Sequence, residues 1–143
     1  FQENTLLSDT IYNNIKAGRE NATEEEIISA AKAAHCHEFI VKLPKGYQTK
    51  LSEGGNTLSG GEKQRVSIAR ALINNPEIIM ADEPCGNLDS YNGEKIMQIL
   101  KKQNLSGKTI ILITHNLEDA VIADRIITMK DGKIFKDENN RQF

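Results

Sequence analysis

LSGGE at residues 58–62 and IIMADEP at residues 78–84 are the two stretches that decide how this chain folds. The first places a serine and two glycines at the start of a long helical pattern. The second ends an apolar run on two adjacent carboxylates. Together they indicate a site for the phosphates of a nucleoside triphosphate. A phosphate loop of the form G-x-x-x-x-G-K-[ST] does not occur in the 143 residues.

The length and composition fit one globular domain. With 143 residues, 38% hydrophobic and 27% charged, the chain is ordinary for that class. The formal net charge of −2 gives no electrostatic reason to expect a nucleic-acid partner. No apolar run approaches the ~20 residues of a membrane span. Because the sequence starts at Phe1 and not at methionine, we expect a piece of a longer protein.

The two cysteines, Cys36 and Cys85, lie far apart and lack the spacing of metal ligands. We therefore expect reduced thiols in a cytoplasmic protein. His35 and His37 flank Cys36, but adjacent residues of a helix face different directions. A metal site at these three residues is rejected for that reason.

Residues 1–75 are expected to form a helical subdomain. The sequence TEEE at residues 23–26 is a capping box, and it predicts a helix that continues to the proline and glycine at 44 and 46. Ser59 with Glu62 repeats the pattern and starts a second helix, which runs to the NNP sequence at 74–76.

Residues 76–143 are expected to form the C-terminal part of an α/β core. Apolar runs predict buried strands at 77–82 and 109–114, and a third strand at 125–129 followed by a hairpin into 134–135. The segments between these strands show helical patterns. The first is a helix capped by Asp89 or Ser90, with Ile96, Ile99 and Leu100 on its inward face, and the second is a short helix at 117–124. This alternation predicts a parallel sheet with right-handed crossovers.

The start of the second helix offers a phosphate-binding site. Its first N–H groups lack partners within the helix, and the helix dipole is positive there. Gly60 and Gly61 let an anion approach the backbone, and the Ser59 hydroxyl adds a donor. The alternative is a simple helix cap, which is common for Ser-Gly-Gly taken alone.

The end of the first strand offers a site for a metal ion and a catalytic base. Ligands of open α/β sheets bind at the carboxyl ends of parallel strands. Asp82 suits Mg²⁺, held through water, and Glu83 can polarise an attacking water. The alternative is a surface turn closed by Pro84. His115 follows the second strand, so it can reach the same edge, although a lone histidine there is usually a surface or capping residue.

These motifs resemble those of the ATP-binding cassette (ABC) ATPases. LSGGEKQR at 58–65 with ARAL at 69–72 resembles the family's signature motif, and IIMADE at 78–83 its Walker B motif. The resemblance implies an α/β fold of the P-loop NTPase (RecA-like) type, here an incomplete parallel sheet with a helical signature subdomain. It also implies ATP and Mg²⁺ as cofactors.

The resemblance further implies a role for each candidate residue. Ser59 and Gly61, with Gly60 and Glu62 beside them, would contact the γ-phosphate held by a second ATPase domain; the family usually has glutamine where Glu62 stands. His115 resembles the H-loop histidine and Asp89 the D-loop aspartate. Gln2 resembles the Q-loop glutamine, which contacts Mg²⁺ and couples the ATP site to the transmembrane domain. The catalytic set is therefore Glu83, His115 and Gln2, with Asp82 and Gln2 at the metal.

The two halves resemble different branches of the family. TIYNNI at 10–15 and FIVKLPKGY at 39–47 resemble exporter-type ATPase domains. MADEP at 80–84 with GNLD at 86–89 resembles lipoprotein-release and macrolide-export ATPases, in which threonine is usual at the position of Cys85.

The resemblance implies an ATP-hydrolysing domain that powers an exporter-like transporter at the cytoplasmic face of the cell membrane. The missing phosphate loop implies that this chain alone neither binds nor hydrolyses ATP. It also implies a gap in the sheet between the strand ending near Thr114 and the strand at 125–129. Two alternatives remain open: a non-transport ABC ATPase of DNA repair or translation, and a non-catalytic interaction fragment.

Overall fold

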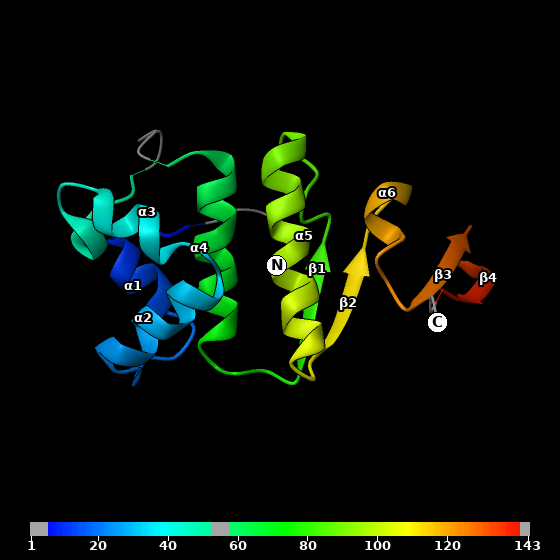
Figure 1. Cartoon of the computed structure of the whole chain (residues 1–143), viewed down its shortest axis with the longest axis horizontal. Helices are drawn as coiled ribbons and strands as arrows, with labels where there is room; N and C mark the ends of the chain where they lie inside the picture. Colours follow the sequence, from blue (N-terminus) through cyan, green and yellow to red (C-terminus); the bar gives the residue numbers. More distant parts are fainter. Residues whose placement is uncertain (1–5, 53–57, 141–143) are drawn as a thin grey trace.

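The computed structural model describes residues 6–52 and 58–140, which form a helical part followed by an α/β part (Figure 1). The helical part contains α1 (Ile11–Lys16), α2 (Glu24–Ala33), α3 (His37–Lys42), the short 3₁₀ helix η1 (Gly46–Gln48) and α4 (Gly60–Leu72). The α/β part contains β1 (Ile78–Asp82), α5 (Ser90–Leu105), β2 (Thr109–Ile113), α6 (Leu117–Ala120), β3 (Arg125–Lys130) and β4 (Lys133–Asn139). Helices α4 and α5 lie side by side where the two parts meet. None of the helices in the described ranges has the length and apolar character needed to cross a membrane.

Both predicted capping boxes are present. The Thr23 hydroxyl accepts a hydrogen bond from the Glu26 N–H, and the Glu26 carboxylate accepts one from the Thr23 N–H. Ser59 and Glu62 exchange the same two hydrogen bonds at the start of α4. Each box satisfies two N–H groups that a helix start would otherwise leave without partners.

The single helix predicted from residue 24 to Pro44 is wrong, because the chain breaks it after α2. His35 adopts a left-handed conformation with φ 53°. The Cys36 N–H then donates to the Ala31 carbonyl at 2.9 Å and the His35 N–H to the Lys32 carbonyl at 3.0 Å. This is a Schellman ending, in which histidine takes the position that glycine usually fills. The break turns Cys36 into the core and starts α3 in a new direction.

The helices of the first part enclose a closed apolar core. Its largest members are fully buried and come from α1, α2, α3 and α4: Ile11, Ile15, Ile27, Ile40, Val66 and Ile68. Burying a side chain of this size contributes about 1.5–3 kcal/mol. The core therefore fixes the direction of α4, whose first turn carries the signature sequence.

Strands β1 and β2 form a parallel pair, as predicted, in a register that sets Asp82 opposite Ile113. Helix α5 connects them and packs on one face of the pair. On that face Ile79 and Ala81 are buried against the predicted inward side of α5, where Ile96 and Leu100 are buried too.

The prediction that both strands are buried is wrong for one face of the pair. Ile78 and Met80 are each 57% exposed, and their neighbours Ile111 and Ile113 are 43% and 49% exposed. Since side chains alternate along a strand, these four residues share the face turned away from α5. No other described element covers that face, so β1 is buried, and β2 partly buried, on the α5 side alone.

The last two strands form a separate antiparallel hairpin. Asp131 (φ 50°) and Gly132 (φ 72°) make the predicted tight turn, and β4 runs much further than the predicted 134–135. Helix α6 ends four residues before the predicted 124, at Ala120. Strand β3 belongs to a different sheet from β2 (Figure 1), so the predicted single parallel sheet holds for β1 and β2 only, and the expected gap lies between β2 and β3.

Candidate functional site

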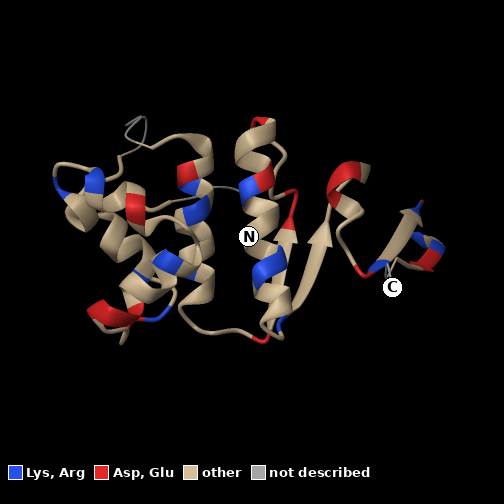
Figure 2. Cartoon of the chain, viewed as in Figure 1, with Lys and Arg blue, Asp and Glu red and all other residues tan. Residues whose placement is uncertain are grey.

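The tips of β1 and β2 carry the predicted carboxylates and histidine to one edge of the parallel pair. The register sets Asp82 beside Ile113, so Glu83 and His115 follow the two strand ends as neighbours. Acidic residues lie at this edge, where β1 ends and in the adjacent α6 (Figure 2). The carboxyl edge of a parallel sheet is where open α/β folds bind ligands.

Glu83 and His115 form the central contact of the site. Nδ1 of His115 lies 2.6 Å from Oε1 of Glu83, and the same oxygen accepts the His115 backbone N–H at 2.9 Å. The other oxygen, Oε2, lies 3.4 Å from the Thr114 hydroxyl. The hydrogen bond from His115 is the main reason why the pKa of Glu83 is held below its usual range. An ionised Glu83 requires a proton on Nδ1, which leaves Nε2 of His115 for a further partner.

The backbone of Glu83 is strained. Its φ of 45° lies in the left-handed region, which costs a non-glycine residue roughly 1–3 kcal/mol. The Glu83 N–H donates to the Ile113 carbonyl at 2.8 Å, and the Glu83 carbonyl accepts the Gly86 N–H at 3.0 Å. Strain of this kind persists where surrounding contacts fix it, and such places are often functional sites.

An open cavity of about 530 Å³ lies in front of this pair. It is lined by Glu83, Cys85, Gly86, Leu88, His115, Asn116, Leu117 and Asp119. Burial, with Glu118 and Glu83 nearby, raises the pKa of Asp119. Burial also raises the pKa of the Cys85 thiol to about 11, so it stays protonated near neutral pH.

Asp82 is the last residue of β1 and is half-buried beside Glu83. Within the described residues, no group of three or more His, Cys, Asp and Glu side chains is placed to hold a metal ion. The carboxylate oxygens of Asp82 suit Mg²⁺, which keeps several of its waters and needs few protein ligands. The second predicted metal ligand, Gln2, lies outside the described residues.

The start of α4 forms a second cluster, whose residues do not line the cavity themselves. Ser59 and Gly60 are exposed, which leaves the first turn of α4 accessible to an anion. The Ser59 hydroxyl accepts from the Glu62 N–H and keeps its own proton to donate. The Glu62 carboxylate is occupied by the Ser59 N–H at 2.8 Å. Ser59 can therefore cap the helix and still donate to a phosphate, as predicted. The Glu62 carboxylate takes part in the capping box.

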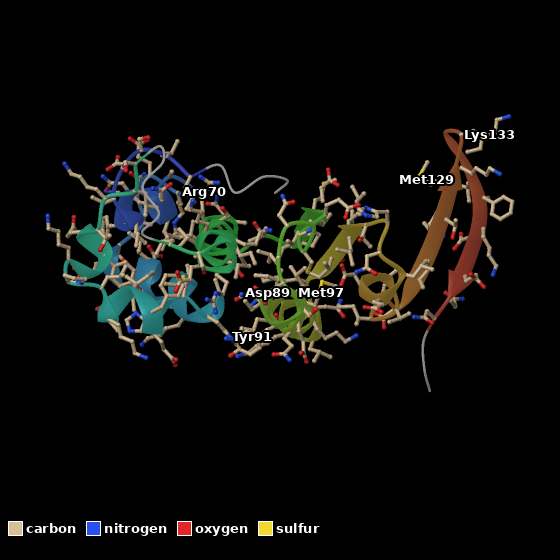
Figure 3. The ribbon with its side chains drawn as sticks, turned by 90° about the horizontal axis from the view of Figure 1, so that it is seen from above. Arg70, Asp89, Tyr91, Met97, Met129 and Lys133 are labelled. Carbon is tan, nitrogen blue, oxygen red and sulfur yellow. The ribbon has the colours of Figure 1, made fainter. Side chains whose placement is uncertain are left out.

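Asp89 joins this cluster through Asn92, a residue that the sequence analysis missed. Asp89 caps α5: its Oδ1 accepts the Asn92 N–H at 3.0 Å and its Oδ2 the Asn92 side-chain amide at 2.7 Å. These hydrogen bonds from Asn92 lower the pKa of Asp89. Asn92 also lies against Gly61, where a Cβ atom would stand 2.6 Å from Asn92 Oδ1. Figure 3 shows Asp89 among the side chains at the start of α5.

Gln64 is a second residue that the sequence analysis missed. It is buried in the middle of the polar signature sequence, and its Nε2 donates to the Pro84 carbonyl at 3.2 Å. A signal was present in the sequence: Gly61, Gln64, Ile68 and Leu72 recur at helical spacing, which places Gln64 on the inward face of α4.

Comparison with known proteins extends this picture. The sequence model of the family described as "ABC transporter" matches residues 1–86. The chain is 43% identical over 141 residues to "ABC transporter B family member 13" of Arabidopsis thaliana, covering 99% of this chain and 11% of that protein. It is 45% identical over 133 residues to the "Probable ABC transporter ATP-binding/permease protein" of Haemophilus influenzae, covering 93% of this chain and 24% of that protein.

A solved structure of an ABC exporter has a similar fold. The structure described as a bacterial Atm1-family ABC exporter with ATP bound matches with a TM-score of 0.85 at 39% identity, covering 97% of this chain and 24% of that one. The fold is therefore that of an incomplete P-loop NTPase sheet with a helical subdomain, as the sequence predicts. This chain spans about a tenth to a quarter of the length of these relatives. The family match, the sequence identities and the fold agree with the motifs at 58–62 and 78–84. The chain therefore belongs to the ABC transporter family.

Proposed function

We propose that this chain is part of the ATP-hydrolysing domain of an exporter-like ABC transporter, with residues 1–75 as the helical subdomain and 76–143 as part of the ATPase core. The observation that carries the proposal is the 2.6 Å contact between Glu83 and His115 at the tips of the parallel strands. The names of the relatives, which pair ATP binding with a permease, support it.

Hydrolysis would be direct attack of water on the γ-phosphate. Oε1 of Glu83 already accepts two N–H groups of His115, so Oε2 is the oxygen better placed to orient the water. His115 would donate through Nδ1 to Glu83 and, when Nε2 also carries a proton, through Nε2 to a phosphate oxygen. Asp82 and Gln2 would hold Mg²⁺, which supplies charge neutralisation for the phosphates. In this chemistry the protein contributes positioning and electrostatics, with no covalent intermediate.

The second cluster would act on the nucleotide of another ATPase domain. The exposed Ser59 and Gly60, with Gly61 behind them, would close the partner's site around the γ-phosphate. Asp89 would carry changes between the two domains, since its cap is linked through Asn92 to Gly61. The complete assembly would therefore be a dimer of ATPase domains with two Mg-ATP between them. A transmembrane domain would be its other partner, at the cytoplasmic face of the cell membrane.

The change Glu83→Gln in the full-length protein tests this proposal. Glutamine keeps the size of the side chain but cannot activate water, so ATP should bind without turnover and hold the ATPase dimer closed. We expect loss of turnover and a stable ATP-bound dimer in native mass spectrometry. The control is Glu118→Gln, an exposed carboxylate of the nearby α6 that does not line the cavity. Unchanged turnover in Glu83→Gln would remove Glu83 from its role.

The 143-residue chain alone should neither bind nor hydrolyse ATP, because its sequence holds no phosphate loop. Each charge-assisted hydrogen bond to the phosphates contributes roughly 1.5–3 kcal/mol, and each ~1.4 kcal/mol is tenfold in affinity. Isothermal titration calorimetry of the chain with Mg-ATP measures this directly. Micromolar binding would contradict the expectation.

A further inference from the structure

The turn that carries Glu83 is held from three directions. The Glu83 N–H donates to the Ile113 carbonyl of β2, and the Glu83 carbonyl accepts the Gly86 N–H within the turn itself. The third hold is on the next peptide group, where the Pro84 carbonyl accepts the side-chain amide of Gln64 at 3.2 Å. Proline has no N–H, so the carbonyl is the sole hydrogen-bonding group that its backbone offers.

The hydrogen bond from Gln64 differs from the other two because its donor lies in the helical part. Gln64 lies on α4, one turn after Gly61, and it is 3% exposed. Pro84 is buried as well. A hydrogen bond between two buried groups is electrostatically stronger than one in water and is costly to leave unmade. The contact therefore joins the start of α4 firmly to the turn of Glu83.

We propose that Gln64 is a positioning residue for ATP hydrolysis: by holding the Pro84 carbonyl, it keeps Glu83 in its left-handed conformation with the carboxylate on His115. This inference rests on the proposed function, because it concerns the residue assigned to activate water. It also links the two clusters. The hydrogen bond joins Gln64, on the helix whose start would bind the partner's nucleotide, to Pro84, which follows the glutamate that would act on the chain's own nucleotide. Gln64 itself is buried, so it would contact neither nucleotide.

The neighbouring contact between α4 and α5 strengthens this link. Gly61 packs so closely on Asn92 that a Cβ atom would stand 2.6 Å from its Oδ1, and Asn92 is held in turn by Asp89. The first turn of α4 is thus fixed by Asn92 at Gly61, and the following turn by Pro84 at Gln64. Displacement of the α4 start has to displace the turn that carries Glu83.

The test replaces Gln64 in the full-length protein and follows ATP hydrolysis. Gln64→Met keeps the length of the side chain and removes the donor, and Gln64→Asn keeps the amide but withdraws it by one methylene. We expect kcat to fall about 3- to 10-fold in both variants, the loss that one hydrogen bond predicts. KM for ATP should stay within about twofold, because Gln64 does not touch the nucleotide.

Ser67→Ala is the matched control on the same helix. Ser67 is also buried on α4, and its hydroxyl has no hydrogen-bond partner among residues 6–52 and 58–140, so its loss should leave kcat and KM unchanged. Hydrogen exchange gives a second readout: the Glu83 amide should exchange faster in Gln64→Met than in Ser67→Ala.

Each outcome decides the proposal. Wild-type kcat in Gln64→Met would overturn it, and so would a rise in KM without a fall in kcat. Unfolding of both Gln64 variants alongside a folded Ser67→Ala would make Gln64 a structural residue and would also overturn it. Absence of ATP hydrolysis by the wild-type protein would instead contradict the proposed function, which separates the two failures.

Discussion

The helical part and the α/β part bury their apolar side chains to very different degrees. In the helical part, Ile15, Ile27 and Ile40 are fully buried between helices. In the α/β part, Met80 is 57% exposed and Phe135 of the terminal hairpin is 72% exposed. The contrast is not one of composition, because both parts are rich in isoleucine. It shows that the helical part completes its own core, whereas each strand pair has a face that no described element covers.

This difference separates the two clusters of the site. The start of α4 projects from a closed core, so its direction is fixed by packing within the helical part. Glu83 and His115 stand on the tips of strands that are packed on one face only, and local hydrogen bonds hold them together. The contacts of α4 with Pro84 and Asn92 are therefore important, because they attach the less enclosed cluster to the more enclosed one.

Replacing a core isoleucine of the helical part should have the largest effect on stability. Ile68→Ala deletes a side chain that is 1% exposed and leaves a cavity, so we expect a loss of about 2–5 kcal/mol. Ile111→Ala, at a position 43% exposed on the open face of β2, should cost less than about 1 kcal/mol. Denaturant unfolding followed by circular dichroism measures both. Equal losses would show that the open face is covered in solution and would remove the contrast between the parts.

The two glycines at the start of α4 should respond differently to alanine. At Gly61 the new Cβ would stand 2.9 Å from Asn92 Cβ and 2.7 Å from its Cγ, so helix α5 has to shift. We expect a loss of about 1–3 kcal/mol from this overpacking. At Gly60 the nearest atom is the end of the Leu88 side chain, 3.3 Å away, which can rotate aside.

Gly60→Ala is therefore the matched control and should be close to neutral, because alanine also favours the helix. The same unfolding measurement compares the two variants. A neutral Gly61→Ala would mean that α4 and α5 are loosely attached, and the two parts would then move independently.

The features that local patterns determine were predictable from the sequence. Both capping boxes are set by residues three apart, and the strand tips at Asp82 and His115 follow from apolar runs and their ends. The parallel pairing of β1 and β2 follows from the helix between them. These features place Glu83 and His115 together without any knowledge of tertiary contacts.

The features that depend on tertiary packing were not predictable in the same way. The run at 78–82 is apolar throughout, so it indicates burial on both faces, and only the arrangement of other elements decides whether a second face is covered. The break at His35 was missed because a histidine in the left-handed region has no sequence signal like that of glycine. Gln64 and the contact of Asn92 with Gly61 were missed because Pro84 and Gly61 lie on other elements, although the spacing of α4 places Gln64 inward.

The smallest expected effect concerns the acid sensitivity of one carboxylate in each part. The pKa of Glu26 is lowered mainly by Arg19 and that of Glu83 mainly by His115, each from an ordinary value of 4.5. A lowered pKa means that the folded state releases the proton more readily than the unfolded state. The resulting stabilisation is present above about pH 4.5 and is lost as the pH falls through the folded-state pKa. Glu26 is exposed and Glu83 is in part exposed, so solvent screening keeps the contribution small.

Glu26→Gln and Glu83→Gln should each flatten the loss of stability below pH 4.5, which denaturant unfolding across a pH series would detect. Glutamine still completes the capping box at position 26, so that variant isolates the charge from the hydrogen bond. At position 83, glutamine keeps an acceptor for the His115 N–H and loses the charge. If Glu83→Gln kept the full acid-dependent loss while Glu26→Gln reduced it, the pair at the strand tips would not form in solution. The more open part of the molecule would then lack the contact on which its proposed chemistry depends.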